Sequence, residues 1–207
     1  MKFKIATGLL TLTLLGCAFN GLPEGYHDQT PDGISENVEK VFVPPFMEGS
    51  SVRLNDKWLL SAAHNRIIFF LQGREVYYHP TCDVALIRDH KEGATTKVGS
   101  LNVGEGVFVV GYPSLSPLMS HKGKHVGNLT IPKTPCIYGA TNATTIGGMS
   151  GGGVYNAKGE LVGITRGIAL GVDNPTNLQG YSNPTIFTYL ENVQEWMYKI
   201  TGENFYE

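Results

Sequence analysis

Short runs of β-branched and aromatic residues, separated by turn residues, recur along most of the chain after residue 40. Runs of three to six such residues, with no helical period between them, are typical of β-strands. The segments that separate several of them carry the Asn, Asp or Gly residues typical of hairpin turns, at 55–57, 72–73 and 156–159. The pattern predicts eleven strands, at 41–43, 50–54, 58–61, 66–71, 75–78, 84–88, 107–112, 126–131, 136–140, 153–155 and 161–165.

A helical period occurs only near the C-terminus. Ile186, Leu190, Val193, Met197 and Ile200 recur at intervals of 4, 3, 4 and 3 residues, after an Asn-Pro pair and before a glycine. This spacing predicts an amphipathic α-helix over 186–201. Strands followed by one terminal helix favour an all-β protein with two small antiparallel barrels, because a parallel α/β sheet needs a helix between successive strands.

Composition narrows the class of protein further. Glycine accounts for 26 of the 207 residues, roughly twice its usual share, which argues against a helical bundle and for many tight turns. The formal net charge of −2 and the absence of any basic run exclude the electrostatic footprint of a nucleic-acid-binding protein. The binding partner or substrate must therefore be inferred from a candidate functional site.

The first residues form a separate unit. Lys2 and Lys4 precede an apolar stretch, 5–15, that is too short to span a membrane and is typical of a secretory signal over 1–16. Its end, Leu-Leu-Gly-Cys, resembles the bacterial lipobox, which implies acylation of Cys17 and attachment to a membrane through a lipid anchor; an ordinary signal with a coincidental cysteine is the alternative. Ala18 in place of Asp favours the outer membrane facing the periplasm, and 17–40 is expected to be the lipidated Cys and a flexible tether.

The most informative segment for chemistry is the glycine-rich run around Ser150. Glycines on both sides of a serine allow a sharp turn that leaves backbone N–H groups free to bind a substrate. By itself the run also matches the nucleophile elbow of α/β-hydrolases, or a plain glycine-rich turn.

Chain order separates these alternatives. An α/β-hydrolase places its His after the Ser, whereas all six histidines here precede Ser150. A subtilisin order could combine an Asp at 28, 32 or 56 with His64, but that fold needs alternating helices that the pattern lacks. The order that remains is His, Asp, Ser.

Two further motifs fit that order. His64 follows an apolar strand and two alanines (LLSAAH, 59–64), and Asp83 stands at the head of a buried strand (DVALI, 83–87). Together with Ser150 and its glycines, these motifs resemble those of the trypsin-like (chymotrypsin-fold) serine peptidases, and the resemblance extends from about Val41 to the terminal helix. It implies a peptidase domain over 41–207, with two six-stranded antiparallel β-barrels, about 41–100 and 101–185, and a C-terminal helix at about 186–201.

The resemblance also implies roles for single residues. Ser150 would be the nucleophile, His64 the general base, and Asp83 the group that orients His64. The N–H groups of Gly148 and Ser150 would form the oxyanion hole, and neither a metal nor an organic cofactor is needed. The 19-residue spacing from His64 to Asp83 leaves room only for a strand, the 72–73 turn and a second strand. Asp89 is the only nearby acid that could replace Asp83, but it lies at the far end of the strand that follows Asp83 and would point to the wrong end of the barrel.

Specificity is weakly encoded. The expected pocket residues are Thr144, Thr145, Thr165 and Gly167, which suit a small, polar or acidic substrate side chain. Arg166 could add positive charge there, although its position also suits a solvated structural residue.

Cys82 and Cys136 are the cysteines that remain if Cys17 is lipidated. An exported protein can join them in a disulfide across the cleft between the two barrels, and two free buried thiols are the alternative.

The functional expectation is a serine endopeptidase acting on protein or peptide substrates at the cell envelope. The alternative is a catalytically inactive trypsin-fold binding module on the envelope.

Overall fold

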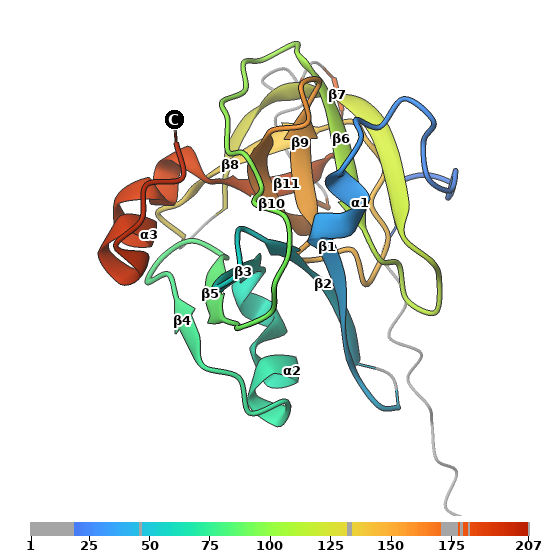
Figure 1. Ribbon diagram of the computed structural model, residues 1–207. Coiled ribbons are helices and arrows are strands. Elements are labelled where there is room, and N and C mark those ends of the chain that lie inside the picture. The colour runs from blue at the N-terminus through green and yellow to red at the C-terminus, as the bar shows by residue number, and fades with distance from the viewer. Residues whose placement is uncertain are drawn as a thin grey trace, which may run out of the picture.

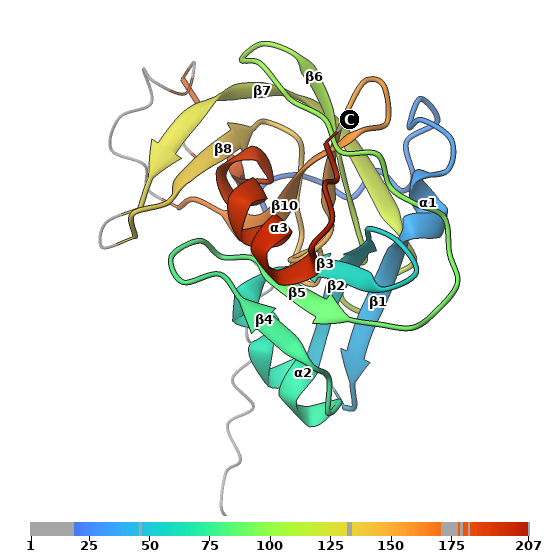
Figure 2. The same cartoon turned by 60° about the vertical axis from the view of Figure 1, so that its left-hand side comes forward.

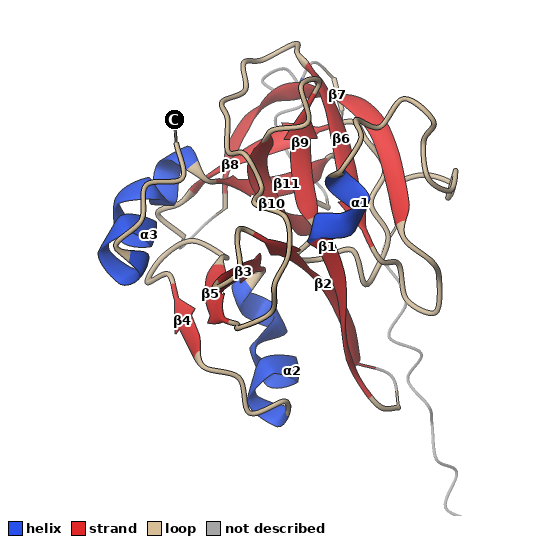
Figure 3. Ribbon diagram, in the orientation of Figure 1, coloured by secondary structure: helices blue, strands red, loops and turns tan. Residues whose placement is uncertain are grey.

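The computed structural model describes residues 19–45, 47–131, 134–170, 178, 180, 181 and 183–206. Most of its regular structure is β (Figure 3). A five-stranded antiparallel sheet, in the order β1-β2-β3-β5-β4, is followed by a closed antiparallel barrel in the order β10-β11-β8-β7-β6-β9 (Figure 1). The strands are β1 Val38–Val43, β2 Met47–Arg53, β3 Trp58–Ser61, β4 Val76–Tyr78, β5 Ala85–Arg88, β6 Gly106–Gly111, β7 Met119–Thr130, β8 Ile137–Thr141, β9 Gly153–Asn156, β10 Leu161–Ile168 and β11 Thr185–Tyr189. The helices are α1 Ile34–Asn37, α2 Arg66–Leu71 and α3 Gln194–Thr201, with 3-10 turns η1 Ala63–Asn65 and η3 Glu191–Val193.

This architecture confirms the predicted chymotrypsin-like fold, but the N-terminal half differs in detail from the expectation. In the described residues it is a five-stranded sheet and not the closed six-stranded barrel expected over 41–100. The run 66–71, predicted as a strand, is helix α2, with Ile68 and Phe69 buried and Phe70 81% exposed. An apolar run of this length is too short to distinguish the period of a helix from that of a strand, and here tertiary packing favours the helix.

The prediction of a hairpin at 72–73 is therefore also wrong. The N–H of Gln72 donates to the carbonyl of Ile68, so this pair of residues closes α2. A helix and the short strand β4 separate His64 from Asp83, where two strands were expected.

The C-terminal helix begins later than its apolar period predicted. Thr185–Tyr189 is strand β11, which pairs with β8 and β10 and closes the barrel. After the turn η3, helix α3 starts at Gln194 and not at 186. Ile186 is a buried residue of this strand. It lies four residues before Leu190, so its position matched the helical spacing by coincidence.

The segment 19–40 is packed on the domain, so the prediction of a flexible tether is wrong for these residues. Phe19 forms an isolated β-bridge with Ile146, and the hydroxyl of Thr30 shares a 2.6 Å hydrogen bond with that of Ser120. Ile34 is buried in the core. The predicted signal at 1–16 and Cys17 lie outside the described residues.

One core joins the two halves. The largest cluster of buried apolar side chains includes Leu60 and Leu86 from the sheet and Ile164 and Ile186 from the barrel. Burying a side chain of this size contributes about 1.5–3 kcal/mol, so the shared core fixes the two halves against each other. Helix α3 lies where they meet (Figure 2), with Met197 in the same cluster. Within the described part of the chain, no helix has the length and apolar character needed to cross a membrane.

Candidate active site

His64 is presented by a turn at the end of a buried strand. Strand β3 is buried along its whole length, and the chain then enters η1, which leaves the His64 side chain 47% exposed. The next residue, Asn65, is buried, and its Nδ2 donates to Ser61 Oγ (3.2 Å) and to the carbonyl of Ser150 (3.0 Å). Asn65 therefore ties the turn of His64 to the loop of Ser150. Asn65 is not among the residues predicted from the sequence, where its only local signal is a polar residue directly after the histidine.

Asp83 lies in a tight loop between β4 and β5. His79 Nδ1 accepts the N–H groups of Thr81 (3.2 Å) and Cys82 (2.9 Å), which keeps this loop short. The Asp83 side chain is 13% exposed, and its Oδ2 lies 2.7 Å from His64 Nδ1. The backbone N–H of His64 donates to Oδ1 at 2.9 Å. Both carboxylate oxygens thus bind His64, as the predicted pairing requires.

The charge state of Asp83 follows from these contacts. Burial would raise the pKa of its carboxyl, but the hydrogen bonds from His64 and the nearby positive charge of Arg166 outweigh burial and hold the pKa below its usual value. Asp83 is therefore ionised at neutral pH. Its contribution to stability is present above the pKa of the unfolded chain and is lost as the pH falls through the lowered pKa of the folded state.

Asp89, the acid considered in place of Asp83, belongs to another cluster. It binds Arg53 and Arg74, the latter at 2.8 Å. In the described residues no hydrogen bond or ion pair joins it to His64. Asp83 is the acid that the fold brings to the histidine.

The loop of Ser150 passes very close to the first sheet. Gly148 and Gly151 have φ angles of +97° and +87°, which disfavour residues with a side chain. A Cβ at Gly151 would also collide with the carbonyl of Ser50 and the hydroxyl of Ser61. The carbonyl of Ser150 accepts the N–H of Ser50 at 2.8 Å. The glycines are needed for this approach.

The hydroxyl of Ser150 points to strand β10. Ser150 Oγ donates to the carbonyl of Arg166 at 3.0 Å, and no hydrogen bond joins it to His64 in the described structure. The N–H groups of Gly148 and Ser150 have no acceptor among the described residues, so both remain available to a ligand. The fold therefore gathers the predicted residues in one place, with His64 and Asp83 paired and Ser150 turned aside.

Of the predicted pocket residues, only some lie beside His64. Gly167 lines a hollow of about 410 Å³ together with His64, Asp83, Arg166, Ile168 and Ile186. Thr145 and Thr165 are buried, and the latter exchanges 2.8 Å backbone hydrogen bonds with the Ser150 loop. Thr144 packs against Gly21 of the N-terminal segment. The assignment of a specificity pocket to these residues remains a prediction.

A disulfide joins Cys82 to Cys136, a pairing that the sequence alone left open. Cys82 precedes Asp83, and Cys136 directly precedes strand β8 of the barrel. The bond spans a sequence separation of 54 residues. It therefore anchors the loop of Asp83 to the second half of the domain.

Removing this bond is expected to destabilise the protein. The double substitution Cys82→Ala/Cys136→Ala should lower the free energy of unfolding by about 2–4 kcal/mol, because the unfolded chain regains the freedom of a long loop. Urea denaturation measures the change. Reductant should shift the wild-type midpoint toward that of the variant and leave the variant unchanged. Equal midpoints for the oxidised wild type and the variant would contradict this expectation.

No cluster of three or more His, Cys, Asp or Glu side chains suited to a metal ion occurs in the described residues.

Known proteins resemble the chain in sequence and in fold. It is 30% identical over 134 residues to a glutamyl endopeptidase of Staphylococcus epidermidis, an alignment that covers 58% of this chain and 45% of that protein. The chain thus spans less than half the length of the curated relatives it matches. Its fold is similar to that of the HtrA-type protease AlgW with a tripeptide (TM-score 0.65, 18% identity, 83% of this chain and 62% of that one). It is also similar to the active form of the Rv3671c protease from M. tuberculosis (TM-score 0.64, 17% identity, 81% and 82%).

These two structural similarities, at under 20% identity, establish the fold. The sequence match goes further, since residues 52–164, just over half of the chain, fit the family model of the trypsin-like peptidase domain. The chain therefore belongs to the family of trypsin-like serine peptidases.

Proposed function

We propose that this protein is a serine endopeptidase that cleaves protein substrates with Ser150, His64 and Asp83. The observation that carries the proposal is the double contact of the Asp83 carboxylate with His64, at 2.7 Å to Nδ1 and 2.9 Å to the backbone N–H. With Nδ1 bound to a carboxylate, the other ring nitrogen is the one that can take a proton from Ser150. The loop of Ser150 is tied to the same turn through Asn65.

The proposed reaction proceeds in two halves. Ser150 leaves the carbonyl of Arg166, transfers its proton to His64 and attacks the scissile carbonyl, while Asp83 stabilises the imidazolium. The N–H groups of Gly148 and Ser150 bind the developing oxyanion, where losing one donor typically costs about 10²–10³ in rate. His64 then protonates the leaving amine, and water attacks the acyl-enzyme by the same path in reverse. The match to the peptidase family supports a peptide substrate, and so does the similarity of the fold to a protease whose structure holds a tripeptide.

The proposed place of action is the cell envelope. Lys2, Lys4 and the apolar stretch before Cys17 support export and lipid attachment, with the outer membrane facing the periplasm as the site. Because the described chain is already packed on the domain at Phe19, two residues after Cys17, the linker could span at most about 7 Å. A lipid on Cys17 would therefore hold the domain close to the membrane.

One observation favours a second function, a catalytically inactive binding module of the same fold. The hydroxyl of Ser150 is hydrogen-bonded to the carbonyl of Arg166 and not to His64. If this arrangement persisted with a peptide bound, the chain would bind peptides without cleaving them.

Labelling with a fluorophosphonate probe separates the two functions. The full chain is expected to react covalently, because the probe phosphonylates a serine only where a base and an oxyanion hole activate it. Ser150→Ala should abolish the labelling. Ser116→Ala is the matched control, since Ser116 is also partly buried but its hydroxyl donates to the carbonyl of Ser114.

Circular dichroism of both variants checks that they are folded. A folded wild-type protein without Ser150-dependent labelling would refute the peptidase and support the binding module.

A further inference from the structure

Arg166 lies at a β-bulge in strand β10. The pairing of β10 with β11 aligns Thr165 with Phe187 and Gly167 with Ile186, which leaves Arg166 as an extra residue without a partner. A bulge next to an active site typically redirects a side chain. The bulge here accompanies contacts of Arg166 with two predicted triad residues.

One of these contacts is an ion pair. Arg166 Nε lies 3.2 Å from Asp83 Oδ2, the same oxygen that lies 2.7 Å from His64 Nδ1. The guanidinium also lies over the ring of Tyr138, 5.1 Å from its centre. The Arg166 side chain is only 33% exposed, so this charge is held close to Asp83 and partly shielded from solvent.

The loop of Asp83 is short, and the barrel covers the aspartate from the other side. Thr188 of β11 donates to the carbonyl of Asp83 at 3.3 Å, and Arg166 of β10 binds its carboxylate. The charged or titratable groups that act on this carboxylate are His64 and Arg166, and Tyr138 of β8 lies near both Asp83 and Arg166. Arg166 therefore supplies the one permanent positive charge in the group.

We propose that Arg166 is a positioning residue of the active site, which fixes the Asp83 carboxylate in its contact with His64. This inference rests on the proposed function, in which Asp83 orients His64 for proton transfer from Ser150. With two donors on Oδ2 and one on Oδ1, the carboxylate cannot rotate without losing a bond. A fixed cation beside the carboxylate also favours its ionised form, which is the form that accepts hydrogen bonds from the imidazole and from the backbone of His64.

The test compares charge-removing and charge-keeping variants of the full chain. Arg166→Gln removes the charge, Arg166→Lys keeps it, and Arg166→Leu is a second neutral variant that retains apolar contact with Tyr138. Arg74→Gln is the matched control, because Arg74 is 31% exposed, forms a 2.8 Å ion pair and contacts Asp89 instead of Asp83.

The first measurement is an NMR pH titration of the Asp83 carboxyl in the Ser150→Ala background, with the signal assigned by its loss in Asp83→Asn. Against the effect of burial, hydrogen bonds from His64 and the charge of Arg166 hold the pKa of this carboxyl below its usual value, so we expect the midpoint to rise in the two neutral variants and to stay near that of the parent in Arg166→Lys and Arg74→Gln. The second measurement, with Ser150 intact, is the rate of fluorophosphonate labelling, which should fall severalfold in the two neutral variants and be retained in Arg166→Lys and Arg74→Gln.

An unchanged Asp83 midpoint in folded Arg166→Gln or Arg166→Leu would overturn the inference. A midpoint in Arg166→Lys that rises as far as in the neutral variants would overturn it too, because the effect would then not follow the charge. Absence of labelling in the wild type would overturn the proposed function instead. The NMR titration decides on Arg166 in either case, since it needs no catalysis.

Discussion

Replacing His64 with alanine is expected to lower the rate of peptide-bond cleavage by about 10⁴–10⁶-fold, while the protein stays folded. In the proposed mechanism nothing takes the proton of Ser150 once the imidazole is gone. Members of a catalytic triad act as a unit, so losing one costs nearly as much as losing all. The fold should tolerate the change, because the His64 side chain is 47% exposed and the Asp83 carboxylate keeps Arg166 and the His64 backbone N–H as partners. Initial rates on a labelled unfolded protein such as casein measure the loss.

The control for this prediction is His90→Ala. His90 is exposed and follows β5, outside the hollow beside His64. Its replacement should leave the rate within a factor of about two, typical of a surface change without a catalytic role. A rate for His64→Ala within tenfold of the wild type, with the same thermal stability, would show that another group serves as the base.

The parts of the site that could be predicted are those with local signals. His64 follows a buried strand, Asp83 precedes one, and the glycines around Ser150 are required by positive φ angles and by a close backbone approach. Each feature is visible within a few residues of the chain, and their order along it excluded the other hydrolase folds. The double contact of Asp83 with His64 lies where that order placed it.

The parts that could not be predicted depend on distant partners. The run 66–71 has no period long enough to distinguish a helix from a strand, and only packing decides that Phe70 faces solvent. The segment 19–40 has the composition of a tether, yet Asn20 accepts the N–H of Thr145, 125 residues away. Arg166, which contacts Asp83, lies at a bulge in β10, and a bulge leaves no periodic pattern in the sequence.

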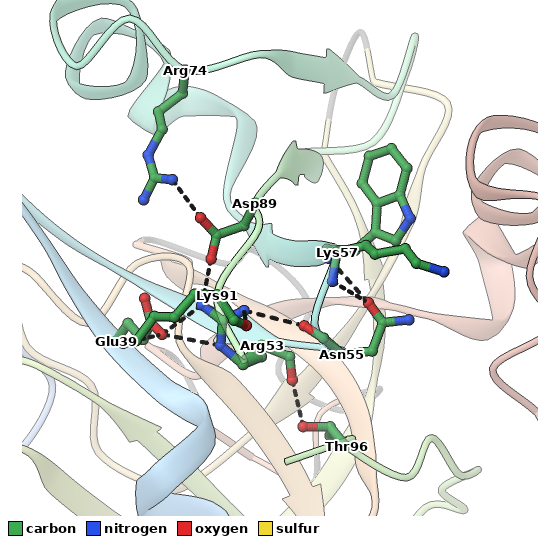
Figure 4. A network of polar contacts seen from close by, with 9 residues as sticks. Glu39, Arg53, Asn55, Lys57, Arg74, Asp89, Lys91 and Thr96 are labelled. Atoms are coloured by element: carbon green, nitrogen blue, oxygen red, sulfur yellow. Dashed lines mark hydrogen bonds and ion pairs between the residues drawn. The ribbon is translucent and has the colours of Figure 1, made fainter. Parts of the chain in front are cut away.

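Arg53→Met is expected to lower the free energy of unfolding by about 3–5 kcal/mol, the largest effect on stability among these predictions. Arg53 is 1% exposed, and Figure 4 shows its guanidinium between Glu39 and Asp89. All five N–H donors are used: two bonds go to Glu39 Oε1 (2.8 and 3.1 Å), one to Asp89, and one each to the carbonyls of Asn55 (3.1 Å) and Lys91 (2.9 Å). Methionine fills the space but leaves two partly buried carboxylates without this cation.

The pH dependence identifies the cause of the loss. Burial would raise the pKa of Asp89, but its hydrogen bonds with Arg53 and Arg74 outweigh burial and lower it. Asp89 therefore stabilises the fold above its unfolded pKa, and this contribution disappears as the pH falls through its folded pKa. In Arg53→Met much of this contribution is already absent. The difference in the free energy of unfolding between wild type and variant should therefore be large at pH 7 and small at about pH 3.

Urea denaturation at both pH values measures this gap, with Lys91→Gln as the control. Lys91 contacts the same Glu39 oxygen at 3.2 Å but is 69% exposed, so its replacement should change the free energy of unfolding by less than about 0.5 kcal/mol. A gap for Arg53→Met that is equally large at both pH values would assign the loss to packing instead of to the unpaired carboxylates. A loss below about 1 kcal/mol at pH 7 would mean that Glu39 and Asp89 find other partners, such as Arg74, when Arg53 is gone.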